Sequence, residues 1–124
     1  MRADVVELVT VVETSAFSKQ ASEIWTDEER DAFVYFIAAN PEAGAVIRET
    51  GGVRKVRWSA QGRGTRGGAR VIYFFYNRNA PIYLLMAYSK SVREDLSRKE
   101  KKQLRDEVTK LKKALGQRKD VPNE

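Results

Sequence analysis

The sequence predicts an α+β fold in which a small, mostly antiparallel β-sheet is packed by N-terminal helices and a C-terminal helix. Three consecutive segments are rich in β-branched and aromatic residues and are separated by turn signals, as successive strands are: residues 53–58, 69–76 and 82–88. Thr26 and Ser97 each precede a glutamate by three residues, which is the capping-box spacing that starts a helix. These two helix starts lie on either side of the three strands, so helices are expected before and after the sheet.

The first part of the chain is expected to form one strand and a short helix. Val5 to Val12 is a nearly continuous run of apolar and β-branched residues, which favours a strand covered on both faces. Thr14 or Ser15 can cap a helix that turns Phe17 and Ala21 inward.

A second helix begins after Thr26 and ends at Asn40, because a residue that precedes a proline avoids helical backbone. Helical spacing gives it one apolar face, formed by Ala32, Phe33, Phe36 and Ile37. Trp25 and Tyr35 flank this face, and we expect both to pack in the core. Two segments are expected to be loops: residues 41–52 and the glycine-rich turn at 61–68.

Residue alternation assigns a face to each side chain of the strands. In the first strand of the hairpin, Val56 and Trp58 point toward the core, and Lys55 and Arg57 stand together on the open face. The strand at 82–88 is apolar on both faces, so it is expected in the interior of the sheet. If the alternation persists, Lys90 continues the face of Leu84, Met86 and Tyr88.

The C-terminal helix is expected to start after Ser97 and to stop at Gly116. Its apolar residues form one narrow stripe, at Leu104, Val108, Leu111 and Leu115. Such a basic amphipathic helix is expected to dock on its own sheet, with contact to a membrane or to nucleic acid as the alternative. The domain organisation that follows is a single domain over residues 1–116 and a flexible tail at 117–124.

Composition excludes several classes of chemistry. The 124 residues include no cysteine and no histidine, which removes disulfides, thiol nucleophiles, imidazole mechanisms and the usual zinc sites. No cofactor or metal site is therefore expected. The N-terminal apolar run contains acidic residues and is too short to span a bilayer, so no membrane segment is expected and a cytoplasmic location is the default.

The net charge of +6 is unevenly distributed, because residues 1–47 hold three basic and nine acidic residues whereas residues 48–124 hold twenty and eight. The predicted hairpin carries six cations and no acidic residue: Arg54, Lys55, Arg57, Arg63, Arg66 and Arg70. Such a cluster repels itself, so an anion is expected to bind it. The simplest role for it is a patch that binds nucleic acid without catalysis.

The same cations can also carry out chemistry on RNA, which contains its own nucleophile in the 2′-hydroxyl group. A protein can cleave RNA by holding the reacting atoms in line and by neutralising the charge that develops on the phosphate. Lys and Arg suit this task. Crowding by Arg57 and Arg70 disfavours the charged form of Lys55, which offers a route to a neutral Lys55 that accepts a proton.

Several segments resemble the RelE/ParE superfamily of bacterial toxins from toxin–antitoxin pairs, and within it the HigB-like branch: VVETSAFSK, DEERDAFVYFIAANPEAG, TGGVRKVRWSAQGRGTRGGARVIYFFY and PIYLLMAYSKSVREDLS. The resemblance covers nearly the whole chain. It implies a small sheet with helices on one face, and a metal-independent, ribosome-dependent mRNA endonuclease that cuts in the ribosomal A site. It also implies a cognate antitoxin, often with a helix-turn-helix DNA-binding domain, and a pair that represses its own operon.

The resemblance assigns a role to individual residues. Lys55 falls on the proton acceptor, Arg57 and Arg70 fall on positions that stabilise the phosphate, and Lys90 falls on an acid or charge-stabilising position. Arg93 is a second candidate for the last position. Contacts to RNA or the ribosome are assigned to Arg54, Arg63, Arg66 and Arg93. The tyrosine in the C-terminal helix of the best-known members has no counterpart, because no tyrosine follows Tyr88.

Two other functions remain open on the sequence. One is an inhibitor of DNA gyrase without nuclease activity, as in the ParE branch. The dense basic hairpin argues against it, because that branch has generally lost the catalytic cations. The other is a non-enzymatic RNA-binding module, which predicts salt-dependent RNA binding without cleavage.

Overall fold

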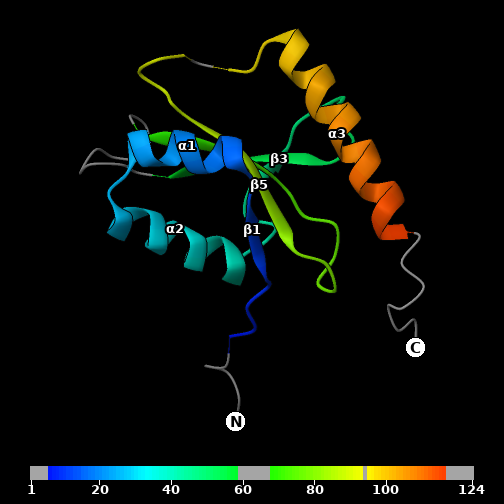
Figure 1. Cartoon of the computed structure of the whole chain (residues 1–124), viewed down its shortest axis with the longest axis horizontal. Helices are drawn as coiled ribbons and strands as arrows, with labels where there is room; N and C mark the ends of the chain where they lie inside the picture. Colours follow the sequence, from blue (N-terminus) through cyan, green and yellow to red (C-terminus); the bar gives the residue numbers. More distant parts are fainter. Residues whose placement is uncertain (1–5, 59–67, 94, 117–124) are drawn as a thin grey trace.

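The computed structural model describes residues 6–58, 68–93 and 95–116. The elements follow one another as β1 (Val11–Glu13), α1 (Ser15–Ile24), α2 (Asp27–Ala39), β2 (Ala45–Val46), β3 (Val53–Trp58), β4 (Ala69–Phe74), β5 (Ile82–Ser89) and α3 (Arg98–Gly116). Figure 1 shows α1 and α2 on one side of the strands and α3 on the other. The predicted tail at residues 117–124 and most of the predicted turn at 61–68 lie outside the described residues.

The strands form one five-stranded sheet in the order β1-β5-β4-β3-β2. Among the described strands, only β1 and β5 pair in parallel, and the other three pairs are antiparallel. The predicted α+β class with a mostly antiparallel sheet is therefore confirmed. The apolar strand β5 lies between β1 and β4, as its two apolar faces predicted.

Each face of the sheet has its own apolar core. Phe17, Phe33 and Ile37 of the N-terminal helices pack on one face against residues such as Val56 and Val71. The opposite face is covered by α3 and by Leu96 just before it: Leu96, Leu104 and Val108 pack there against Val53, Ile72 and Phe74. The expectation of helices on one face only is wrong, because the apolar stripe of α3 buries a second set of strand residues.

Two of the predicted strands have different bounds, and one further strand was not predicted. The first strand covers only Val11–Glu13, because earlier backbone groups bond elsewhere: Val9 N–H donates to the carbonyl of Ala38 at the end of α2. Strand β4 ends at Phe74 rather than Tyr76. Residues 41–52 were expected to be a loop, but they contain the two-residue strand β2, which pairs with Arg54 and Lys55.

An irregularity in β5 changes which residues share a face. The register between β4 and β5 shifts between Ile72 and Tyr73, so that Ile72 pairs with Met86 but Tyr73 pairs with Leu84. The intervening Leu85 is the extra residue of a bulge. Leu84 therefore packs in the first core, whereas Met86 and Tyr88 pack in the second. The prediction that these three side chains share a face is wrong for Leu84.

The helices begin at the residues that the sequence predicted. Thr14 caps α1, and Phe17 and Ala21 are buried as predicted. Thr26 and Glu29 form the complete capping box of α2. Ser97 and Glu100 exchange the same pair of bonds before α3.

The apolar face of α2 is rotated slightly from the predicted one. Phe33 and Ile37 are buried, but the third buried residue is Ala38, whereas Ala32 is exposed. Trp25 packs in the core as predicted, but Tyr35 is 56% exposed. No helix in the described part of the chain is long and apolar enough to cross a membrane.

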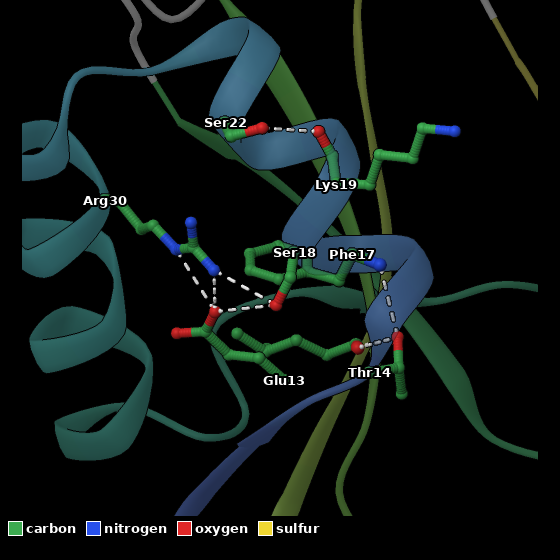
Figure 2. Close-up of polar contacts among 8 residues, drawn as sticks. Glu13, Thr14, Phe17, Ser18, Lys19, Ser22 and Arg30 are labelled. Atoms are coloured by element: carbon green, nitrogen blue, oxygen red, sulfur yellow. Dashed lines mark hydrogen bonds and ion pairs between the residues drawn. The ribbon is translucent and has the colours of Figure 1, made fainter.

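Polar contacts join α2 to the start of the chain. Figure 2 shows Arg30 of α2 pointing toward Glu13 and Ser18, and the Arg30 guanidinium forms an ion pair with Glu13. The same guanidinium donates to the Ser18 hydroxyl at 3.1 Å and lies over the Phe17 ring. These contacts hold α1 and α2 against the face opposite α3.

Candidate functional site

The strand register places the predicted cations on one face of the sheet. Lys55 and Arg57 share the face of Val53, which is buried in the core under α3. Arg57 pairs with Arg70 across β3 and β4, and Arg70 pairs with Tyr88 across β4 and β5. Directly opposite residues have Cβ atoms about 4.5–5.5 Å apart, so the three side chains form a row across the sheet. We call these three residues the cationic row, after its two arginines: Arg57, Arg70 and Tyr88. Lys55 lies beside the row on β3.

The members of this site differ in burial. Arg70 is only 4% exposed, whereas Arg57 is exposed and the Lys55 side chain is 32% exposed. A buried guanidinium is held in one orientation by its surroundings. Arg70 is therefore a fixed cation at the base of the site, and Lys55 and Arg57 stand nearer to solvent.

A carboxylate that the sequence did not indicate lies at this site. Asp95 is 40 residues from Lys55, yet its Oδ1 is 3.5 Å from Lys55 Nζ. The backbone N–H of Leu96 donates to Asp95 and lowers the pKa of its carboxyl group, and the nearby Lys55 lowers it further. Asp95 is thus a carboxylate that keeps its negative charge next to the predicted base.

Arg93 comes from the segment between β5 and α3. Its guanidinium lies 4.7 Å from the centre of the Tyr88 ring and donates to Glu100 at 2.7 Å. Arg93, the second candidate for the Lys90 position, is therefore part of the site.

Lys90 itself follows the end of β5. Its backbone N–H donates to the carbonyl of Gly68, just before β4, and its side chain is partly buried. This bond ties the end of β5 to the start of the strand that carries Arg70.

Arg54 is not brought together with the other cations. Alternation places it on the opposite face from Lys55, where its guanidinium donates to the carbonyl of Gly44 at 2.7 Å. The predicted RNA contacts Arg63 and Arg66 lie outside the described residues.

Tyr88 has an unusual environment for a tyrosine. Its side chain is 6% exposed, and its hydroxyl is buried without a hydrogen-bond partner among the described residues. Burial raises the pKa of the phenol, and the Asp95 carboxylate raises it further, whereas Arg93 and Arg70 oppose the shift. The phenol therefore keeps its proton at neutral pH.

A second basic surface lies on α3. An open cavity of about 500 Å³ is lined by one carboxylate and five cations: Glu49, Arg98, Lys99, Lys101, Lys102 and Arg105. Arg105 donates to the backbone carbonyl of Glu49, which joins α3 to the turn before β3. The predicted docking of α3 on the sheet leaves these cations outside the buried stripe of Leu104 and Val108, beside the turn that contains Glu49.

The contact between Arg93 and Glu100 predicts a pH dependence of stability. The hydrogen bond from Arg93 lowers the pKa of the Glu100 carboxyl group below its unfolded value. Its stabilisation is therefore present above the unfolded pKa, about 4.3, and is lost as the pH falls through the lower folded pKa. We expect Glu100→Gln to lower the free energy of unfolding at neutral pH and to lose this effect in acid. Urea unfolding of both proteins at the two pH values measures it, and a difference that is independent of pH would contradict it.

A comparison with known families agrees with this geometry. A family model described as the RelE toxin of the RelE/RelB toxin–antitoxin system matches residues 38–119. The match includes β3, β4, β5 and α3, the elements that carry or cover the cationic row. It covers well over half of the chain. The chain belongs to the RelE toxin family and is a toxin of a toxin–antitoxin system.

Proposed function

We propose that this toxin is a ribosome-dependent mRNA endonuclease that cleaves mRNA in the ribosomal A site by attack of the RNA 2′-hydroxyl on the neighbouring phosphate. The observation that supports this most strongly is the cationic row with Lys55 beside it. These residues come from three strands and converge on one face of the sheet. Fixed cations around a phosphodiester stabilise the charge that develops during transfer.

Each residue has a proposed role. Arg57 and Arg70 hold the phosphate, because a guanidinium presents paired donors to phosphate oxygens. Lys55 accepts the proton of the 2′-hydroxyl, and Asp95, whose carboxylate is 3.5 Å from Lys55 Nζ, is the alternative acceptor. Lys90 or Arg93 adds positive charge on the side of β5. The nucleophile is supplied by the RNA, so we propose that the reaction needs no metal.

The partners follow from the same proposal. A toxin of this kind has an antitoxin, and we propose a helix-turn-helix protein that covers the cationic row and represses the operon. The cations of α3 around the open cavity can contact ribosomal RNA, in a binding mode that salt weakens. The proposed compartment is the cytoplasm, where ribosomes work, and the proposed subgroup is the HigB-like branch, on the sequence resemblance.

Mapping of mRNA 5′-ends in a purified translation system tests the proposal. We expect wild-type protein to produce new 5′-ends at A-site codons only when ribosomes are programmed with the mRNA. Lys55→Ala should lower the cleavage rate by about 10²-fold or more, the usual contribution of a positioned acid or base. Lys19→Ala is the matched control, because Lys19 is an exposed lysine on α1 and points away from the contacts drawn in Figure 2.

Other outcomes would redirect the assignment. Cleavage of free RNA at the same rate as mRNA on programmed ribosomes would show that the nuclease does not depend on the ribosome. Intact mRNA together with altered DNA topology would favour a gyrase inhibitor. Salt-dependent RNA binding without any cleavage on ribosomes would leave a binding module.

A further inference from the structure

The buried hydroxyl of Tyr88 is a polar group that stabilises no contact within the described part of the fold. A buried hydroxyl that lacks a hydrogen bond lowers the stability of the fold, because it has lost its bonds to water without replacing them. The Tyr88 hydroxyl has no partner among the described residues, although the ring is packed in the core under α3. Phenylalanine would fill the same space without this cost. The hydroxyl therefore calls for an explanation outside the packing of the core.

Its neighbours indicate what kind of group it can meet. Tyr88 stands directly opposite Arg70, which in turn stands opposite Arg57. The charged groups that act on the phenol are Arg70 and Arg93, which favour an anion there, and Asp95 and Glu100, which disfavour one. An anionic ligand bound between Arg57 and Arg70 would thus have the Tyr88 side chain next along the row.

Arg93 lies directly beside this position. Its guanidinium covers the Tyr88 ring and is held by Glu100. A phosphate at the cationic row competes with Glu100 for Arg93, because both are anions that accept hydrogen bonds from guanidinium. Movement of Arg93 toward the phosphate would uncover Tyr88 on the same side.

We infer that the Tyr88 hydroxyl is the proton donor to the leaving 5′-oxygen in the cleavage reaction. This inference rests on the proposed function. The 2′-oxygen forms a bond to phosphorus, the bond from phosphorus to the 5′-oxygen breaks, and the 5′-oxygen keeps the electron pair and takes the phenol proton. The 2′-hydroxyl proton passes to the acceptor at Lys55 or Asp95, and the phenolate then regains a proton from water. The products are a 2′,3′-cyclic phosphate and a 5′-hydroxyl.

Tyr88→Phe separates a catalytic role from a structural one. We expect cleavage in the ribosome assay to fall by about 10²-fold or more, while the melting temperature stays equal or rises, because the buried hydroxyl is removed without loss of ring packing. Tyr83→Phe, at the other end of β5, is the matched control and should cleave as wild type. Equal cleavage by wild type and Tyr88→Phe would overturn the inference and leave the proposed function intact.

A chemically altered mRNA identifies the step. With sulfur in place of the bridging 5′-oxygen, the leaving group is a thiolate, which needs no proton because thiols ionise at a pKa of about 8.5. We expect this mRNA to restore cleavage by Tyr88→Phe nearly to the wild-type rate, and not to restore cleavage by Lys55→Ala. A defect of Tyr88→Phe that is equal on both mRNAs would overturn the role as proton donor. No cleavage of either mRNA by the wild type would overturn the proposed function and this inference together.

Discussion

Replacing Arg70 with alanine is expected to lower the rate of ribosome-dependent mRNA cleavage by roughly 10²–10³-fold, which is the usual loss when one charge-stabilising donor is removed from a transition state. Arg70 stands in the middle of the cationic row, opposite Arg57 on one side and Tyr88 on the other. It is also 4% exposed, so its charge acts in a region that excludes water, where electrostatic stabilisation is strongest. The measurement is the single-turnover rate of 5′-end formation on programmed ribosomes.

Two further variants show whether the charge or its shape matters. Arg70→Lys keeps the charge but loses the planar fork, so its rate should lie between those of wild type and Arg70→Ala. Arg78→Ala removes an exposed arginine from the turn between β4 and β5 and should not change the rate. Melting curves must show that Arg70→Ala is folded at the assay temperature. A folded Arg70→Ala that cleaves within a few-fold of wild type would exclude Arg70 from the site.

Strands β3, β4 and β5 and the helix starts were predictable because their signals are local. Alternation alone placed Lys55 and Arg57 on one face and Val56 and Trp58 on the other. The capping box of Thr26 and Glu29 needs only residues that are three positions apart. Such patterns depend on the backbone geometry of a single helix or strand, so they can be read without knowing which elements pack against it.

The parts that were missed depend on contacts between distant segments. Asp95 meets Lys55 only because α3 and the segment before it fold over the face that β3 presents. The bulge at Leu85 moves Leu84 to the other face, and no residue in β5 indicates from the sequence that a bulge is present. The site around Tyr88 was not predicted, since its sequence context shows neither the paired Arg70 nor the missing hydrogen-bond partner.

Helix α3 covers part of the sheet face that carries Lys55 and Arg57. The sequence predicted an open side for Lys55 and Arg57, but the same face is a packed core at Val53 and Ile72. The site is therefore the uncovered end of a buried face, bordered by Asp95 and Arg93 from the segment before α3. This arrangement combines a buried charge at Arg70, where charge interactions are strong, with the exposed side chain of Arg57, which a polyanion can reach.

Phe33→Ala is expected to have the largest effect on stability, about 3–5 kcal/mol lower free energy of unfolding. The Phe33 side chain is fully buried in α2, and its ring lies 5.3 Å from that of Trp25 and 5.4 Å from that of Trp58. Its loss leaves a cavity between α2 and the end of β3, and the aromatic neighbours cannot collapse into it without moving the strand. Urea unfolding followed by tryptophan fluorescence measures the change.

Tyr35→Ala is the matched control, because Tyr35 belongs to the same helix but is 56% exposed, and we expect it to change the free energy of unfolding by at most about 0.5 kcal/mol. Trp58 directly follows Arg57 in β3, so unfolding of this core would also disperse the cations on the opposite face. The cleavage lost in Phe33→Ala should then follow the unfolded fraction and be regained at lower temperature, unlike the loss in Arg70→Ala. A Phe33→Ala protein that unfolds like Tyr35→Ala would show that this aromatic core does not hold the sheet.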